Sequence, residues 1–373
     1  MTGKRKTSHR KRVVGLQAAS ALALLGLLLL SVLPVQAERL DRSSRARYTP
    51  SAPRAILTST PAAIARARPL QLTDPGCCAN PDWSSDSDWV VYFDSPGRED
   101  AGLFAVPTSG GEPLLVHARV GVYSNDLSLV AYKENGQTYI ERWVDGTRWL
   151  IDNQGREVMF SPDGRWVTWS YISSGVTFPN LRQRTIWIAA IDGSEAHEIV
   201  TVTGGEFLGW TEAEEAILVS GRLAPDMPAG IWRIQVDDGA GLLLHEVEVP
   251  LRPLVSPQGR RIAFVVAFEE TGQNGLWVVN SDGSGVRRLN LFGAYRWMGE
   301  DDLLVIPMDL SAGGPSLWHV AVESGVSERW LDLAASGHGI LNNDWAVSPD
   351  GTRLVFRSTR DAALWAFSLP ATP

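Results

Sequence analysis

Short stretches of alternating apolar and polar residues, each opened by the same kind of turn, recur from residue 83 to the end of the chain. The clearest turns read Ser-Pro-Asp-Gly or Ser-Pro-Gln-Gly and begin at Ser161, Ser256 and Ser348. Weaker copies begin at Ser84 and Ser124, and two degenerate copies fill the remaining gaps. The Asp position of the turn falls at residues 86, 126, 163, 213, 258, 300 and 350. A recurrence every 37 to 50 residues indicates a repeat architecture.

Each repeat predicts several short β-strands. Alternating strands are predicted after the turns, over residues 89–93, 129–132, 166–170, 216–220, 261–265, 303–306 and 353–357. A further strand in each repeat opens with an aromatic residue: Phe104, Tyr139, Trp187, Trp232, Trp277, Trp318 and Trp365. Asp-Gly pairs, as at Asp192-Gly193 and Asp282-Gly283, then predict a hairpin, because this turn needs positive φ. Four short strands per repeat are typical of a β-propeller blade.

The 15 tryptophans also fit a propeller, because all of them lie at or after Trp83. Large flat side chains suit the wedge between neighbouring blades, so we expect most of them to serve the core. The last repeat has no room for a fourth strand before Pro373. The segment 68–73 (Arg-Pro-Leu-Gln-Leu-Thr) resembles the fourth strands elsewhere and is predicted to complete that blade. The prediction is an all-β, single propeller of seven four-stranded blades, closed by an N-terminal strand, or of six if the weak second repeat merges with a neighbour.

The stretch from Leu276 to Gly285 and the Ser-Pro-Asp-Gly turns resemble the repeats of TolB-like propellers. The resemblance covers residues 68–373 and implies the propeller fold. Its implications for function are broader, since such repeats occur in binding proteins, in peptidase accessory domains and in some sugar lyases. Two repeats lack the turn, so the strand register there is not fixed by the resemblance.

The first 37 residues differ from the rest of the chain. Six basic residues between Lys4 and Arg12 precede an apolar stretch over 13–35, and Val35-Gln36-Ala37 resembles a signal-peptidase site. This order predicts a signal peptide, with an uncleaved N-terminal membrane anchor as the alternative. Residues 38–67 are rich in Arg, Ser, Pro and Ala and predict a flexible basic linker. We therefore expect the propeller to be exported: periplasmic, extracellular, or anchored on the outer side of the cytoplasmic membrane.

Charge narrows the classes of partner. The whole chain carries a formal charge of −8, and removal of the six leader cations leaves −14. An acidic domain does not suit nucleic acid, whose phosphates need cationic partners. We expect another envelope or extracellular protein, or a neutral or cationic ligand. The alternative is that the acidity serves only to keep an exported protein soluble.

Linear motifs for catalysis are absent from the sequence. No Gly-x-Ser-x-Gly elbow is present, and no segment remains to form the α/β-hydrolase domain of a prolyl oligopeptidase. The Ser-Pro-Asp-Gly turn does not have the spacing of a sialidase Asp box. His117, His197, His245, His319 and His338 each stand alone in their repeats, which predicts no metal site. We therefore predict no catalytic, cofactor-binding or metal-binding residues, although a propeller can assemble a site from several blades.

Cys77 and Cys78 are the two cysteines of the chain and are adjacent. Export would allow them to oxidise. Neighbouring Cα atoms lie about 3.8 Å apart, closer than the roughly 4.4–6.8 Å of most disulfides, and a bond between them encloses no loop. Two free thiols, a strained vicinal disulfide, an intermolecular link and a local packing role all remain open. We expect a thiol titration of the unfolded, unreduced protein to find no free cysteine.

Loop lengths predict which face binds a partner. Ser-Pro-Asp-Gly turns and Asp-Gly hairpins share one face and are short. The other face receives longer, variable loops, and variable loops on a rigid scaffold are where binding residues concentrate. The candidate binding residues on that face are Cys77, Cys78, Tyr171, Arg182, Arg184, His338, Asn342 and Asn343. The sequence favours a non-catalytic binding or scaffold propeller of the cell envelope; the alternative is a lyase-like enzyme acting on acidic polysaccharide, with a site assembled across blades.

Overall fold

The Ser-x-Asp turn is the local unit of the fold. In the computed structural model, which describes residues 68–96, 101–267, 273–308 and 315–371, the Ser161 hydroxyl donates to Asp163 and accepts the N–H of Trp166. Asp163 also accepts the N–H of Arg165, and Gly164 adopts the φ of 70° that favours glycine. These bonds fix a tight reversal, so each turn joins two antiparallel strands.

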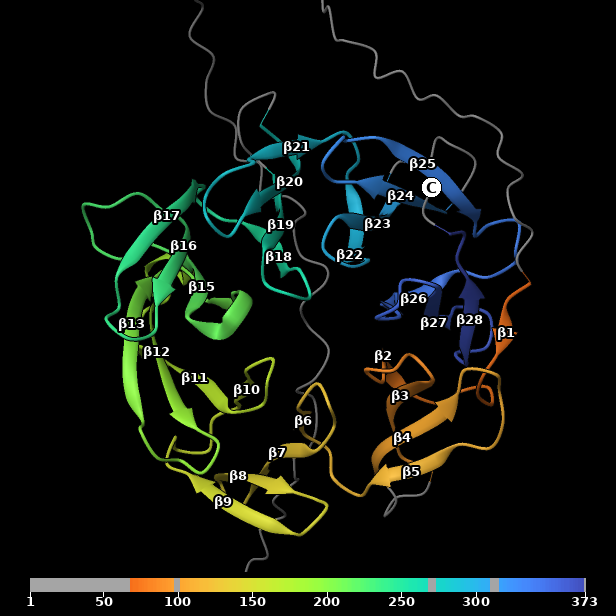
Figure 1. The fold of residues 1–373 in the computed structure, drawn as a ribbon, viewed down its shortest axis with the longest axis horizontal. Coiled ribbons are helices and arrows are strands. Elements are labelled where there is room, and N and C mark those ends of the chain that lie inside the picture. The colour runs from red at the N-terminus through yellow and green to blue at the C-terminus, as the bar shows by residue number, and fades with distance from the viewer. Residues whose placement is uncertain (1–67, 97–100, 268–272, 309–314, 372–373) are drawn as a thin grey trace, which may run out of the picture. The chain divides into compact units, whose positions relative to one another are not determined.

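The strands form seven four-stranded antiparallel sheets arranged as a ring, which confirms the predicted propeller (Figure 1). Blade 1 contains β2 (Ala79–Trp83), β3 (Trp89–Asp94), β4 (Gly102–Pro107) and β5 (Leu114–His117). Blade 2 contains β6 (Val122–Tyr123), β7 (Leu129–Glu134), β8 (Gln137–Arg142) and β9 (Thr147–Ile151). Blade 3 contains β10 (Met159–Phe160), β11 (Trp166–Ile172), β12 (Gln183–Ala190) and β13 (His197–Thr203). The weak second repeat therefore forms its own sheet, and the six-blade alternative is wrong.

The remaining blades follow in chain order. Blade 4 contains β14 (Phe207–Trp210), β15 (Ala216–Gly221), β16 (Gly230–Gln235) and β17 (Gly241–Glu246). Blade 5 contains β18 (Leu251–Val255), β19 (Arg261–Val266), β20 (Gly275–Asn280) and β21 (Arg287–Leu289). Blade 6 contains β22 (Gly293–Trp297), β23 (Asp302–Pro307), β24 (Ser316–Ala321) and β25 (Ser327–Asp332). Blade 7 contains β26 (Ile340–Val347), β27 (Arg353–Ser358), β28 (Leu364–Ser368) and the N-terminal strand β1 (Leu70–Gln71).

Strand β1 closes the ring as expected. It pairs antiparallel with β28, with Leu70 opposite Ala366, and the N–H of Leu72 donates to the carbonyl of Leu364. The side chain of Thr73 accepts the N–H of Leu364 in return. The first and last parts of the chain thus share one sheet, and the ring has no open end.

Seven clusters of buried residues hold the blades together, one between each pair of neighbours. Seven of the 15 tryptophans are buried, among them Trp83, Trp210 and Trp345. Six more are partly buried and pack against these clusters, so most of them serve the core as expected. The cluster between blades 1 and 2 is the smallest, with Val91, Leu103 and Ala105 as its buried members. Apolar area removed from water between the sheets is the main stabilising term of such a ring.

Two faces follow from the topology. The turn face carries the Ser-x-Asp turns and the hairpins between third and fourth strands. The loop face carries the loops between second and third strands and the links between blades, such as 74–78 and 333–339. The predicted leader and linker, residues 1–67, lie outside the described residues. Of the described residues, none belongs to a helix with the length and apolar character to cross a membrane.

Candidate binding site at the axis

The first strand of each blade is the innermost (Figure 1), and four of these strands carry a bulge: β14, between Phe207 and Gly209, and the three strands β2, β18 and β26 described next. In β2, Ala79 pairs with Phe93 and Asp82 pairs with Val91, so one extra residue is inserted. Comparable irregularities occur in β18 between Leu251 and Leu254 and in β26 between Ile340 and Trp345. Bulges of this kind redirect side chains and are frequent next to functional sites.

Each of these three bulges contains a non-glycine residue with positive φ. The values are 53° for Asn80, 51° for Arg252 and 60° for Asn343. Such a conformation costs about 1–3 kcal/mol per residue, so the surrounding contacts must hold it in place. Because three strained residues lie on inner strands, the channel is the candidate functional site.

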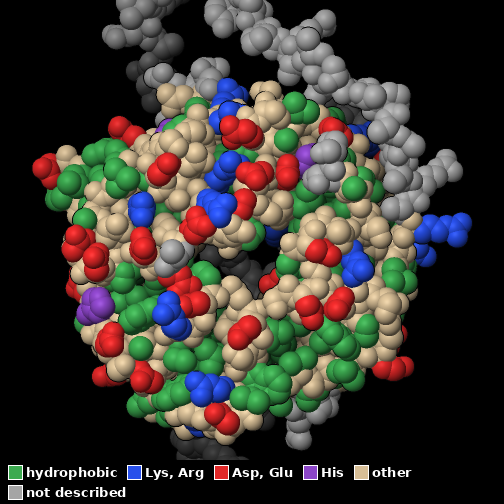
Figure 2. Space-filling model, in the orientation of Figure 1, with side chains coloured by type: hydrophobic (Ala, Val, Ile, Leu, Met, Phe, Trp, Pro, Cys, Tyr) green, Lys and Arg blue, Asp and Glu red, His purple; other side chains and the backbone are tan. Residues whose placement is uncertain are grey.

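The bulged strands border a cavity of about 660 Å³ at the axis. Figure 2 shows the ring hollowed at its centre, with acidic and basic side chains beside the opening. The polar lining residues are Asn80, Asp82, Arg296, Asn343, Asp344 and Arg357. They come from blades 1, 6 and 7, and Leu254 and Pro257 of blade 5 add an apolar wall.

Two carboxyl groups line this cavity without forming an ion pair. Burial raises the pKa of Asp82, although water reaches the side chain through the channel; the Trp83 N–H and the charge of Arg296 oppose that shift. Burial also raises the pKa of Asp344, against a hydrogen bond from the Asn80 N–H and the charges of Arg357 and Arg296. Among the described residues neither carboxylate forms an ion pair. A cation that entered the cavity would therefore meet two acceptors with free lone pairs.

Arg296 has a different role, because its guanidinium is used within the fold. It donates to the carbonyls of Trp345, Asn343 and Tyr295 at 2.9–3.1 Å, and it lies over the Trp345 ring with 4.9 Å to the ring centre. Burial and the charge of Arg252 lower its pKa. These bonds tie β22 to the bulge of β26 and hold Asn343 in its positive-φ conformation.

The sequence-predicted residues fall into two groups on the loop face. Cys77, Cys78, His338 and Asn343 lie at blades 7 and 1, with Asn342 also in β26; Tyr171, Arg182 and Arg184 lie on blade 3. The structure does not bring the two groups together. Asn343 is the member of the predicted set that lines the axial cavity.

Several of these residues have local structural partners. His338 is buried, bonds through Nδ1 to Ser358 Oγ at 3.0 Å, and packs on Trp365. Arg184 donates to the Gly205 carbonyl at 3.1 Å, and Arg182 donates to the Val176 carbonyl at 3.0 Å. The ring of Tyr171 lies beneath Arg156 and meets Trp187 edge-on. These contacts position loops and do not by themselves create a site.

The sequence interpretation missed Asp82, Arg296, Asp344 and Arg357. A signal was present for three of them: Asp82, Arg296 and Asp344 each directly precede a tryptophan of an inner strand. Alternation turns the tryptophan towards a neighbouring blade and the charged residue towards the channel. Trp83 and Trp345 are indeed buried, with exposed fractions of 6% and 3%.

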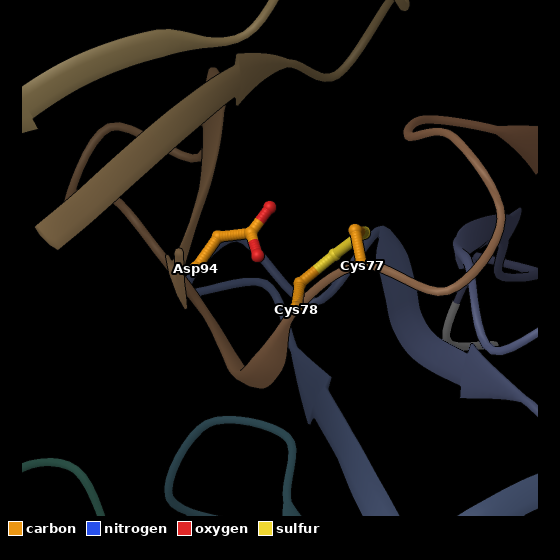
Figure 3. A group of neighbouring side chains, drawn as sticks. All are labelled: Cys77, Cys78 and Asp94. Carbon is orange, nitrogen blue, oxygen red and sulfur yellow. A yellow bond between two sulfur atoms is a disulfide. The ribbon is translucent and has the colours of Figure 1, made fainter. Parts of the chain in front are cut away.

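Cys77 and Cys78 are joined by a vicinal disulfide in the link between β1 and β2 (Figure 3). This outcome agrees with the expectation that neither cysteine is free. The side chain of Asp94 at the end of β3 is turned towards the sulfur atoms. Among the described residues these three side chains are the one group of potential metal ligands, all within 4.8 Å of one another.

Comparison with known proteins gives the fold and a short local match. No family model matches the chain. A tricorn protease homolog of Streptomyces coelicolor is 46% identical over 57 residues, which is 15% of this chain and 4% of that protein. The chain thus matches only a small part of that much longer relative.

Solved structures agree over most of the chain. An oligogalacturonate lyase in complex with manganese aligns with a TM-score of 0.60 at 12% identity, covering 82% of this chain and 93% of that one. An oligogalacturonate lyase from Vibrio parahaemolyticus gives 0.57 at 9% identity, with the same coverages. TolB from Acinetobacter baumannii gives 0.40 at 16% identity, covering 69% of this chain and 64% of that one. The alignments with the two lyases agree with the β-propeller fold of the chain.

Proposed function

We propose that this chain is a non-catalytic, exported binding propeller that contacts another envelope or extracellular protein at the loop face. The observation that carries the proposal is the axial cavity lined by two carboxylates that form no ion pair, Asp82 and Asp344. Export rests on the basic, apolar and small-residue order of residues 4–37.

The charges of the cavity indicate the chemistry of the partner. The cation of Arg296 is surrounded by carbonyl groups, whereas Asp82 and Asp344 keep free acceptor positions. A Lys or Arg side chain on a partner segment would satisfy both carboxylates and recover part of their desolvation cost. The overall acidity of the exported part would speed encounter with such a basic segment.

A lyase is the second candidate, and it is favoured by the fold similarity to the two oligogalacturonate lyases. A manganese centre prefers oxygen and imidazole ligands held close together. The axial cavity lining contains two carboxylates and no histidine, and the described group of three potential ligands contains a disulfide. Among the described residues, no third potential ligand gathers with the two carboxylates of the axial cavity, so the binding function is the better account.

Replacement of both carboxylates tests the proposal. Asp82→Asn together with Asp344→Asn keeps side-chain shape and removes both charges. We expect the amount of partner recovered after cross-linking in intact cells to fall at least tenfold. Asp192→Asn with Asp282→Asn removes the same charge from turn-face hairpins and should leave recovery unchanged. Equal recovery from both double variants contradicts the proposal, and release of unsaturated products from oligogalacturonate would favour the lyase.

A further inference from the structure

The link between β1 and β2 brings two sulfur atoms and one carboxylate together beside the blade 7–blade 1 seam. The ligand atoms of Cys77, Cys78 and Asp94 lie within 4.8 Å of one another (Figure 3). Cys77 and Cys78 come from the link, whereas Asp94 comes from the end of β3, which is fixed in the blade 1 sheet. The three groups therefore converge from two separately anchored segments.

The sulfur atoms lie in surroundings that are typical of a metal site: an apolar wall and a hydrogen-bonding hydroxyl. Cys78 is 7% exposed and packs in the cluster that includes Leu72, Trp83 and Tyr92. The Thr73 hydroxyl lies 2.8 Å from Cys77 Sγ and also accepts the N–H of Leu364. Because a disulfide sulfur carries no proton, the hydroxyl is the donor here. Such outer partners orient the atoms that bind a metal, and an apolar wall limits water around it.

Asp94 is available as a third ligand. Its carboxylate accepts the N–H of Ser95 at 2.7 Å, which leaves further lone pairs, and among the described residues it forms no ion pair. Two thiolates and one carboxylate with an open fourth position match a three-ligand zinc site. Thiolates also bind Zn²⁺ and other thiophilic ions in preference to Mg²⁺, Ca²⁺ and Mn²⁺.

We propose that Cys77, Cys78 and Asp94 form a redox-gated site for one thiophilic divalent cation such as Zn²⁺. In the disulfide state the sulfurs are not thiolates and bind no metal. A dithiol reductant supplies two electrons and two protons, becomes a disulfide itself, and leaves two thiols on this chain. Binding of the cation then forms two sulfur–metal bonds and releases both thiol protons to solvent. This inference is independent of the proposed binding function.

Cadmium titration of the purified full chain tests the site, because Cd²⁺ bound to thiolates gives an ultraviolet charge-transfer band. We expect the reduced protein to bind one equivalent that Zn²⁺ displaces and a large excess of Mg²⁺ does not. The oxidised protein should give no band. Asp94→Asn should weaken affinity by at least about tenfold, the lower end of what loss of even an outer partner costs. Asp94→Glu, which keeps a carboxylate, should lose less.

Asp74→Asn is the matched control, since it removes the same charge from the same link without touching the three-residue group. Its affinity should remain within about threefold of the unchanged protein, because Asp74 is exposed and salt screens its charge. Equal weakening by Asp74→Asn and Asp94→Asn would mean a general attraction of cations and would overturn the site. Binding that survives Cys77→Ser, or absence of binding to the reduced protein, would overturn it as well.

Discussion

Ser256 in the blade 5 turn donates its hydroxyl hydrogen to Glu300 of blade 6, with 2.7 Å between Oγ and Oε2. In four other turns the same serine bond goes to the Asp two residues later, as from Ser161 to Asp163 and from Ser348 to Asp350. Blade 5 has Gln258 at that position, and Glu300 from the next blade supplies the missing carboxylate. A defect in one repeat is thus compensated by its neighbour.

This compensation predicts a stability cycle. Glu300→Ala leaves the buried Ser256 hydroxyl without its acceptor and should cost about 1–3 kcal/mol in the free energy of unfolding. Gln258→Asp should recover part of that loss in the Glu300→Ala background, because the Asp restores the local turn. With Glu300 present, the same change should destabilise, since it places two carboxylates together.

Urea unfolding of the unchanged protein, the two single variants and the double variant measures the coupling between positions 258 and 300. Glu323→Ala is the control, because the Glu323 side chain is 83% exposed and its ion pair with Arg261 is long, at 3.5 Å; it should change stability by less than about 0.5 kcal/mol. Additive effects of Gln258→Asp and Glu300→Ala contradict the compensation.

A second carboxylate pair predicts pH-dependent stability. Glu214 of blade 4 accepts the N–H of Asp163 from the blade 3 turn, and burial, together with the nearby Asp163 carboxyl, raises the pKa of Glu214 to about 7. The folded state therefore holds a proton that the unfolded state releases at lower pH. The stability from this group is fully present below about pH 4.3, the ordinary pKa of glutamate, and is lost as pH rises through 7.

Glu214→Gln should remove this pH dependence and stabilise the protein at pH 8. Its amide keeps an acceptor for Asp163 and carries no charge. Glu212→Gln is the control from the same short helix η2 (Glu212–Glu214), because the hydrogen bond from the exposed Arg260 lowers the pKa of Glu212, the opposite direction from Glu214. The difference between the urea midpoints at pH 5 and pH 8 should shrink in Glu214→Gln. If it equals that of the unchanged protein, Glu214 does not titrate as described.

The closing strand predicts a contrast between two leucines. Leu72, directly after β1, is 4% exposed and packs in the blade 7–blade 1 cluster, whereas Leu70 in β1 is 44% exposed. Leu72→Ala should cost about 2–5 kcal/mol, the range for a buried Leu→Ala change. Leu70→Ala should cost less than about 1 kcal/mol, as is usual for surface positions. Similar losses from both changes, measured by thermal unfolding, mean that ring closure does not depend on this packing.

The fold was predictable from the sequence because its signals are local. Ser161, Asp163 and Gly164 carry the turn within four residues, and residues 68–73 resemble the strand that the last blade lacks. The axial site was not predictable in the same way. Asp82, Arg296 and Asp344 are far apart in the chain and meet only after the ring closes. The sequence around Asn80 and Asn343 does not predict their positive φ, because tertiary contacts such as the hydrogen bonds of Arg296 impose it.

Which turns and loops share a face was predictable from the order of the strands, whereas the residues that line the axial cavity were not. Tyr171, Arg182 and Arg184 were selected for their place on that face, but blade 3 lies across the ring from blades 7 and 1 (Figure 1). A ring places every blade at the same distance from the axis, so a loop-face position alone does not say which residues turn inwards. Bulges decide this, and they depend on register between strands.

Photo-cross-linking in intact cells can show whether a basic partner segment enters the axial cavity. A photoreactive residue at Asn80, an exposed position in the axial cavity, is compared with one at Thr352, an exposed position on the turn face. We expect a cross-link from Asn80 to one exported protein through a Lys- or Arg-rich segment, and none from Thr352. We also expect loss of the cross-link in Asp82→Asn with Asp344→Asn. A cross-link from Thr352 and none from Asn80 would contradict the account.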